Sequence, residues 1–287
     1  MRKLKELIIE KLILICGLAS IFFVVLIFLF LLKEGLAVFK TVSPFKFLFG
    51  KSWYPISEPA QLGILPLILG SLLVTLGAAI ISIPIGVGCA IYIAEIAPLK
   101  IKEILKAGIE LLAAIPSVVL GFIGMVTLVP LVKTVFHLPT GLTAISGSIM
   151  LAFMAMPTIV SIAEDALYSV PKTYKEGALA LGATHWQTIW RVMLPAASSG
   201  ILAAVMLGIG RVIGETMAVM MITGNAAVIP NSILAPVRTL TATIAAEMGE
   251  AVVGAEHYFA LFAVGIVLFV ISFAINVTAD LFLHKRQ

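Results

Sequence analysis

Six long apolar segments constrain the fold of this chain more than any other feature of its sequence. Each is long enough to cross the hydrocarbon core of a membrane as a helix, which takes about 20 apolar residues. They are residues Leu12–Leu32, Ile64–Ile83, Leu111–Val132, Leu142–Ala163, Leu194–Ile222 and Tyr258–Leu281. Only 12% of the 287 residues are charged, about half of the share in soluble domains. The chain is therefore predicted to be an all-α polytopic membrane protein with six transmembrane helices.

The first segment is predicted to be an uncleaved helix, and the basic residues predict its orientation. Its apolar run of 21 residues, Leu12–Leu32, is too long for a signal-peptide core of about 7 to 15 residues. Six spans place both termini on one side, where 12 of the 19 Lys and Arg residues lie. Because basic residues gather on the cytoplasmic side, both termini are expected in the cytoplasm, although four lysines of the first external loop oppose this bias.

Prolines in or near the spans predict bends. Each proline removes a helical hydrogen bond, and backbone freed in this way is tolerated in a membrane only against protein or water. We expect bent helices around a cavity; the alternative is that prolines are simply commoner in membrane helices. The external segment 224–256 is too broken to span and is expected to dip into, or lie across, the mouth. The prolines are Pro66, Pro84, Pro116, Pro130 and Pro157.

Two charged residues, Arg211 and Glu215, lie inside the fifth apolar segment. A charge at the centre of a membrane helix costs about 2.5 to 3.5 kcal/mol on insertion scales, so such residues face the protein interior or an aqueous path. Four residues apart, the two are expected on one helical face, beside a notch of small residues at Gly208, Gly210 and Gly214. The charges could merely pair with each other, at about 4 Å and with roughly 4 kcal/mol of attraction. Intramembrane charges, however, mark a pathway by default.

The chemistry of this pair predicts a path for an oxyanion that carries a proton. A guanidinium grips a tetrahedral oxyanion through two parallel hydrogen bonds. We expect Arg211 to attract the anion, and Glu215 to neutralise Arg211 in the empty path and to accept the substrate's hydrogen bond in the filled one. Phosphate carries such a proton near neutral pH, and sulfate does not. Arg238 is a weaker candidate for the external mouth, because an ordinary solvated loop charge is at least as plausible there.

The longest cytoplasmic loop, about residues 164–191, is predicted to project two short helices. Pro171 suits a first helical turn. Gly182 suits the end of that helix because glycine readily adopts the left-handed conformation. Thr184 and Gln187 have the spacing of a capping box for the second helix. The alternative is an amphipathic pair of helices lying on the membrane surface.

One face of this loop is suited to contact with another protein and resembles a known motif. Gly177 and Ala178 would let a partner approach closely, and Glu176 offers it a carboxylate. The pattern Glu176-Gly177-Ala178, three residues, Gly182, nine residues, Val192-Met193-Leu194-Pro195 resembles the EAA loop of permease subunits of bacterial ATP-binding-cassette importers. Glycine and valine replace an alanine and an isoleucine of that motif. The resemblance implies that this loop is the coupling helix that seats in a cleft of a separate ATPase subunit.

Further stretches resemble the phosphate-specific importer permease, and its PstC-type subunit in particular. They are "IPIGVGCAIYIAE" (83–95), "IPSVVLGFIG" (115–124) and "GRVIGETMAVMMITGN" (210–225), within a likeness that covers residues 62–283. The resemblance implies an N-terminal helix and external loop over residues 1–61 and a type I ABC importer permease core over residues 62–287. It also implies that Arg211 and Glu215 are the charged positions of the pathway.

The same resemblance implies partners and a location. The family's permease works with a second permease subunit (PstA type), a cytoplasmic ATPase dimer (PstB type) and an external phosphate-binding protein (PstS type), and carries inorganic phosphate across the prokaryotic inner membrane. The chain itself is expected to be no enzyme and to bind no cofactor, metal or nucleic acid, because ATP hydrolysis belongs to the separate subunit.

Other classes of function fit the sequence less well. Gly50-Lys51-Ser52 comes nearest to a nucleotide-binding loop, but the glycine needed five residues earlier is Phe45. Cys16 and Cys89 have neither metal nor disulfide-framework spacing. The four histidines are scattered, which disfavours an intramembrane hydrolase. A permease for another oxyanion remains an alternative, as does a proton-coupled secondary transporter with Glu215 as its titrating site, although no internal repeat supports the latter.

Overall fold

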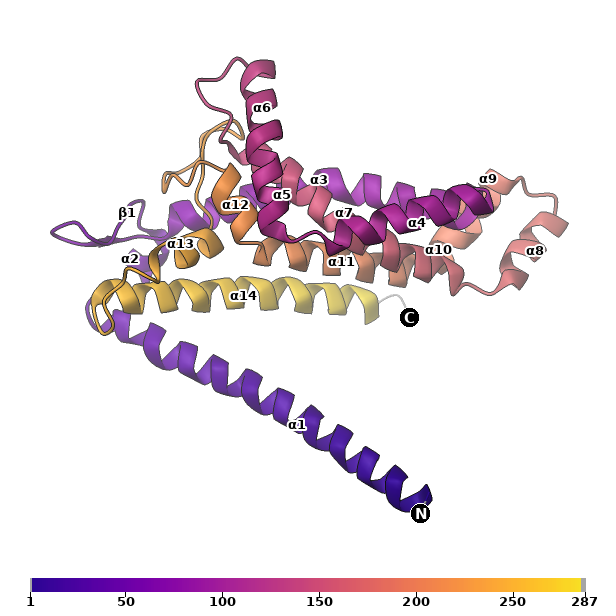
Figure 1. Cartoon of the computed structure of the whole chain (residues 1–287), viewed down its shortest axis with the longest axis horizontal. Helices are drawn as coiled ribbons and strands as arrows, with labels where there is room; N and C mark the ends of the chain where they lie inside the picture. Colours follow the sequence, from indigo (N-terminus) through magenta and orange to yellow (C-terminus); the bar gives the residue numbers. More distant parts are fainter. Residues whose placement is uncertain (1, 285–287) are drawn as a thin grey trace.

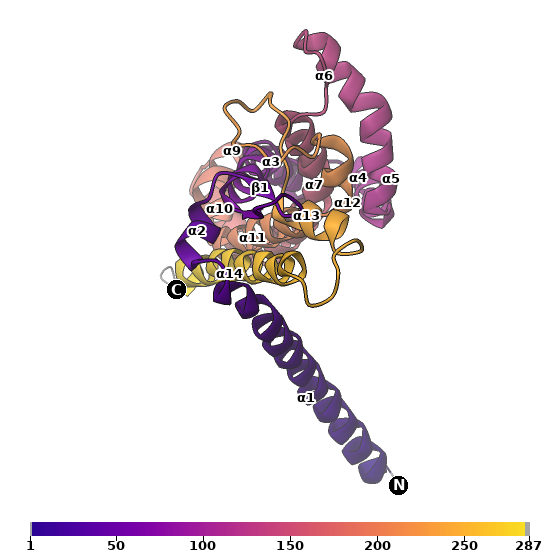
Figure 2. The same ribbon diagram turned by 90° about the vertical axis from the view of Figure 1, so that its left-hand side faces the viewer.

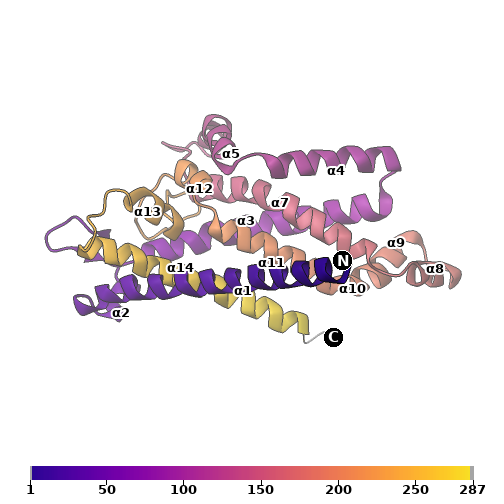
Figure 3. The ribbon, with the colours of Figure 1, turned by 60° about the horizontal axis from the view of Figure 1, so that its bottom comes forward.

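The computed structural model describes residues 2–284 and the side chains of residues 9–278. Its body is a set of long helices that run side by side (Figure 1 and Figure 3). They are α3 (Leu65–Ile91), α7 (Ala144–Tyr168), α11 (Ser198–Gly214) and α14 (Glu256–His284). The C-terminal end of helix α1 (Arg2–Gly35) contacts α14, and toward its N-terminus α1 diverges from the body.

The two ends of this body carry different elements (Figure 1). One end, here called the mouth end, holds the 3₁₀ helix Leu36–Lys40, α2 (Pro44–Phe49), the antiparallel strands β1 (Trp53–Tyr54) and β2 (Gln61–Leu62), and α13 (Leu240–Glu247). The other, here called the loop end, holds α8 (Lys172–Ala180) and α9 (His185–Thr188). The mouth end contains the segments predicted to be external, and the loop end contains the predicted cytoplasmic loop.

The predicted six transmembrane helices are confirmed with one qualification. Among the described residues, five helical stretches are long and apolar enough to cross a membrane. The sixth is a pair of helices, His185–Ala196 and Ser198–Gly214, that are bent by 71° relative to each other. The five are Ile9–Lys40, Leu65–Ile96, Ser117–Val135, Ala144–Tyr168 and Glu256–Thr278.

The third span begins later than the sequence predicts, because a proline divides the predicted segment 111–132. Helix α4 (Leu99–Ala114) runs along α7, and the next residue, Ile115, is extended, as a residue before proline prefers to be. Beyond Pro116 the chain continues as α5 (Ser117–Ile123), a π-helical turn and α6 (Val129–Val135). Helices α5 and α6 leave the body on the side opposite α1 (Figure 1 and Figure 2).

The other prolines act in different ways. Pro84 and Pro157 lie inside the continuous helices α3 and α7, so neither proline ends its span. Pro130 and Pro195 each follow a π-helical turn, at Gly124–Leu128 and Ile189–Met193. A wider turn lets the helix continue past a residue that lacks a backbone N–H donor.

Glycines let α3 and α11 approach α7 closely. A Cβ at Gly86 of α3 would lie 2.8 Å from Cγ2 of Ile159, and one at Gly208 of α11 would lie 2.5 Å from Cγ1 of the same residue. Ile159 of α7 is fully buried. A Cβ at Gly210 or Gly214 would meet nothing within 4 Å. Of the predicted notch, the described part of the chain therefore uses only Gly208 for close packing.

The mouth end has a hydrophobic core of its own. Phe47, Trp53 and Leu62 from the first loop are buried together with Leu240 of α13 and Leu261 of α14. The predicted external loop is thus folded onto the helical body. The segment 224–256 contains α13, whose first residues are buried, and forms no helix of membrane-spanning length among its described residues.

Candidate functional site

The two charged residues of the fifth span lie at a break between helices. Helix α11 ends at Gly214, Glu215 is extended (φ −68°, ψ 133°), and α12 begins at Met217 and ends at Ile222. The expectation that Arg211 and Glu215 share a face of one continuous helix is therefore wrong. Gly214 favours the break because glycine is a poor helix former. The Glu215 carboxylate favours it too, because its Oε1 accepts a hydrogen bond from the backbone N–H of Ala218 at 3.3 Å, in the first turn of α12.

Arg211 is exposed on the last turn of α11. Its Nη1 donates a hydrogen bond to Oγ1 of Thr158 on α7 at 3.3 Å. Within the described side chains this is its one hydrogen bond, and no ion pair joins it to Glu215. The arrangement in which the two charges neutralise each other is thus not the one that the structure adopts. The guanidinium keeps most of its donors for another partner.

Hydroxyl groups surround the other side of the break. Glu215 borders a cavity of only about 10 Å³, which has room for about one water molecule and none for a tetrahedral oxyanion. Its polar lining comes from Ser71 and Thr75 of α3 and from Thr239 and Thr241 at the start of α13. The sequence analysis missed these four residues. Their spacing on otherwise apolar segments, four residues apart on α3 and two apart before α13, was the available signal.

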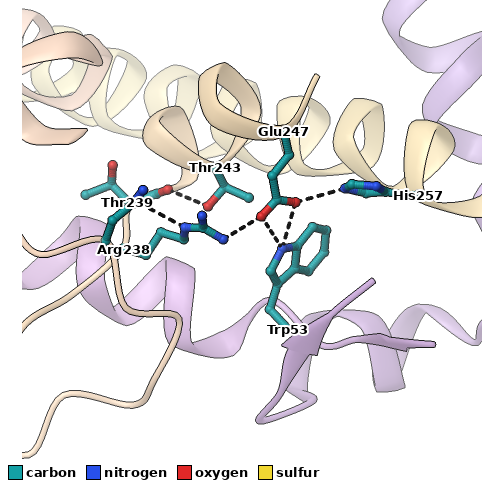
Figure 4. Close-up of polar contacts among 7 residues, drawn as sticks. Trp53, Arg238, Thr239, Thr243, Glu247 and His257 are labelled. Atoms are coloured by element: carbon teal, nitrogen blue, oxygen red, sulfur yellow. Dashed lines mark hydrogen bonds and ion pairs between the residues drawn. The ribbon is translucent and has the colours of Figure 1, made fainter. Parts of the chain in front are cut away.

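At the mouth end, the carboxylate of Glu247 collects three partners (Figure 4). Arg238 forms an ion pair with Oε1, His257 lies 2.9 Å from Oε2 through its Nε2, and Trp53 donates from Nε1 at 3.1 and 3.2 Å. Arg238 also donates from Nε to Oδ1 of Asn225 at 2.9 Å. We call these five residues the Glu247 cluster. Arg238 is therefore neither a free cation at the mouth nor a solvated loop charge. The sequence analysis had not singled out Glu247 or Trp53.

At the loop end, the predicted pair of helices is confirmed in detail. Helix α8 ends in a Schellman arrangement, in which Ala183 N–H bonds to Ala178 C=O at 3.1 Å and Gly182 has φ +83°. Thr184 and Gln187 form the predicted capping box of α9. Both glycine and capping chemistry act within a few residues, which is why the sequence predicted them.

The residues expected to dock on an ATPase lie in the open. Glu176 and Gly177 are exposed, and a Cβ at Gly177 would meet nothing within 4 Å. Gly177 and Ala178 line a groove of about 480 Å³ whose lining also includes Arg191. An ion pair between Lys175 and the largely buried Glu95, in the π-helical turn Tyr92–Ile96 that follows α3, ties α8 to the helical body. The loop thus presents an exposed surface on a base that is anchored to the helical body.

Two solved structures share this arrangement of helices. The MetNI methionine ABC transporter, in inward-facing conformations, matches 81% of this chain and 100% of its own with a TM-score of 0.64 and 20% identity. A bacterial alginate ABC transporter in complex with an alginate pentasaccharide-bound periplasmic protein matches 94% of this chain and 93% of its own with a TM-score of 0.65 and 17% identity. At this identity the likeness shows the fold alone. The fold is that of a type I ABC importer permease.

Residues 82–286 match the family described as the binding-protein-dependent transport system inner membrane component, and the chain belongs to this family. The probable ABC transporter permease protein YqgH of Bacillus subtilis is 42% identical over 274 residues, which cover 95% of this chain and 89% of that protein. The phosphate transport system permease protein PstC of Mesorhizobium japonicum is 37% identical over 260 residues, or 84% of this chain and 79% of that protein. The PstC of Haemophilus influenzae is 35% identical over 260 residues, 84% and 81% of the two chains. The resemblance predicted from the motifs is thereby confirmed.

Proposed function

We propose that this protein is the membrane-spanning permease subunit of an ATP-driven phosphate importer. Phosphate is proposed as the cargo because the chain is 35 to 37% identical, over most of both chains, to relatives named as phosphate transport system permease proteins. The exposed Arg211 supports the same cargo, because a guanidinium with free donors can bind a phosphate oxygen pair. The chain performs no covalent chemistry of its own.

Arg211 and Glu215 divide the recognition of phosphate between them. Arg211 binds the anion by charge and by paired hydrogen bonds. Glu215 accepts a hydrogen bond from the proton that phosphate carries and repels an anion that has none. Arg211 lies on the last turn of α11, Glu215 lies in the break that follows it, and the described contacts include no ion pair between them. Phosphate therefore does not have to break such a pair in order to bind.

A second permease subunit, of the PstA type, closes the path on the face where Arg211 is exposed. Helices α1 and α5 also expose large apolar side chains, such as Phe22, Phe23 and Phe122, that lipid or this subunit would cover. An external phosphate-binding protein, of the PstS type, delivers the anion at the mouth end. The membrane is the prokaryotic inner membrane, with both termini in the cytoplasm.

A cytoplasmic ATPase dimer, of the PstB type, supplies the energy at the loop end. It docks on the surface made by Glu176, Gly177 and Ala178, and the left-handed Gly182 keeps that surface in shape. The ion pair between Lys175 and Glu95 then carries the movement of α8 to α3. Rocking of the helices exposes Arg211 alternately to the two sides of the membrane.

The first test is uptake by the reconstituted complex. The chain is co-expressed with its second permease and ATPase, reconstituted with the external binding protein, and assayed for ATP-dependent phosphate uptake. We expect uptake by the wild type and a loss of about 100-fold in Arg211→Gln, the worth of two charge-assisted hydrogen bonds. Lys133→Gln, at the exposed end of α6, is the matched control and keeps full activity.

Each other outcome has a distinct meaning. Full uptake by Arg211→Gln would remove Arg211 from the pathway while leaving the cargo in place. An assembled wild-type complex that hydrolyses ATP but moves sulfate or another oxyanion instead would overturn the cargo. Uptake that follows a proton gradient and ignores ATP would replace the importer by a secondary transporter.

A further inference from the structure

The backbone at Glu215 is held by a side chain from a distant segment. Since α11 ends at Gly214, the carbonyl of Glu215 has no partner in a continuing helix. The hydroxyl of Thr241 donates to this carbonyl at 2.8 Å, across 26 residues of sequence. Thr241 is buried, with 7% of its surface exposed, so water cannot readily replace this bond.

Thr241 is itself fixed in place by its neighbours. Its hydroxyl oxygen lies 3.1 Å from that of Thr239, the N-cap of α13, whose Oγ1 accepts from the backbone N–H of Ala242 at 3.2 Å. The N–H of Leu240 donates to Oγ of Ser71 on α3 at 2.9 Å. The start of α13 is thus anchored to α3 and presents one aimed hydroxyl to the break.

The far end of α13 is anchored as firmly. Glu247 is its last residue and holds the ion pair and hydrogen bonds of the Glu247 cluster (Figure 4). The helix that joins the two anchors has eight residues and is about 12 Å long. Helix α13 is therefore fixed relative to the mouth end, and the hydrogen bond from Thr241 fixes the Glu215 backbone relative to α13.

We propose that Thr241 is a positioning residue of the pathway, whose hydroxyl fixes the break between α11 and α12 so that the Glu215 carboxylate can select an anion that carries a proton. The role rests on the proposed function of Glu215. This role accounts for the non-helical backbone at Glu215. In a continuous helix a backbone N–H would donate to the Glu215 carbonyl, whereas here the Thr241 hydroxyl donates to it instead. Thr241 acts through its hydrogen bond to the backbone of Glu215.

The test removes the hydroxyl and keeps the shape. In the reconstituted complex, we expect Thr241→Val to lower the preference for phosphate over sulfate about tenfold, the effect of one hydrogen bond to a buried group, while Thr241→Ser keeps the wild-type preference. Thr243→Val is the matched control, because Thr243 is equally buried on the same helix but its hydroxyl bonds to the carbonyl of Thr239 at 2.9 Å. It should leave the preference unchanged.

A double-mutant cycle separates this role from a general loss of structure. If Thr241 acts through Glu215, adding Thr241→Val to Glu215→Gln should cause no further loss of selectivity. Losses that add, or a Thr241→Ser variant as defective as Thr241→Val, would overturn the proposal. Should Thr241→Val fail to assemble, Thr241→Ala takes its place in the same cycle. Wild-type phosphate uptake, measured alongside, tests the proposed function separately, and wild-type selectivity in an assembled Thr241→Val complex would refute only the positioning role.

Discussion

Two arginines in the mouth half of this protein, Arg238 and Arg211, differ in burial and in the number of partners that the fold provides. Arg238 lies in the Glu247 cluster with only 17% of its side chain exposed, and its donors reach a carboxylate and an amide oxygen. Arg211 is exposed and makes a single, longer hydrogen bond to a threonine among the described contacts. A guanidinium whose donors are satisfied by the fold holds structure together, whereas one that the fold leaves underused is available to a ligand. The difference separates the scaffold of the mouth from the proposed pathway.

The largest effect expected from this comparison is a loss of stability when Arg238 at the mouth end is replaced. Arg238→Gln leaves the largely buried Glu247 without its cation, and we expect the free energy of unfolding to fall by about 2 kcal/mol. Breaking a fully buried pair costs about 3 to 5 kcal/mol, and the partial exposure of both side chains, 17% and 15%, reduces this. Thermal unfolding of the purified protein in detergent measures it.

Arg211→Gln is the control for that measurement and should leave the unfolding transition unchanged. Phosphate uptake per assembled complex should respond in the opposite order, lost in Arg211→Gln and retained in Arg238→Gln. The comparison would be wrong if Arg238→Gln abolished uptake without lowering stability.

The second prediction concerns the helix that carries Arg211. Gly208→Ala places a Cβ against Cγ1 of Ile159, so α11 and α7 must separate, and we expect a loss of about 1 to 2 kcal/mol, the usual cost of overpacking. Gly210→Ala, where a Cβ meets nothing within 4 Å, should be neutral or stabilising by up to about 1 kcal/mol. The same unfolding assay on the isolated chain compares them. Equal stabilisation by both substitutions would show that helix propensity rather than contact with α7 decides the result.

The smallest expected effect concerns the hydrogen bond that Trp53 donates within the Glu247 cluster. Trp53→Phe keeps an aromatic ring in a site that is 2% exposed but removes the N–H that donates to Glu247. We expect a loss of about 1 kcal/mol, the net worth of one hydrogen bond. Trp190→Phe, at an exposed position of the loop end, is the control and should cost nothing measurable. An unchanged unfolding transition in Trp53→Phe would limit the cluster to its ionic contacts.

Local features of this protein could be predicted from its sequence. The six spans follow from apolar length alone. The end of α8 at Gly182 and the capping box of Thr184 and Gln187 depend on groups at most a few residues apart, so the residue types there determine the geometry. The break at Pro116 likewise follows from the clash of a proline with the residue before it.

The site itself could be predicted only in part. The sequence singled out Arg211 and Glu215 because charges are rare in apolar spans, but it placed them on one helical face. The structure separates them at a helix break, where the hydroxyl of Thr241, from another segment, donates a hydrogen bond to the non-helical carbonyl of Glu215. No periodicity in the fifth span contains that information.

The sequence by itself determined the membrane class, the number of spans, the shape of the loop over residues 164–191 and the residue types from which a pathway could be made. The tertiary structure alone decided which arginine is engaged and which is available, and where the fifth span breaks. The physical reason is the range of the interactions. Apolar length, glycine and capping residues act over a few positions, whereas Glu247 meets Trp53 across 194 residues and Thr241 meets Glu215 across 26. Only packing of the whole chain brings such partners within hydrogen-bonding distance.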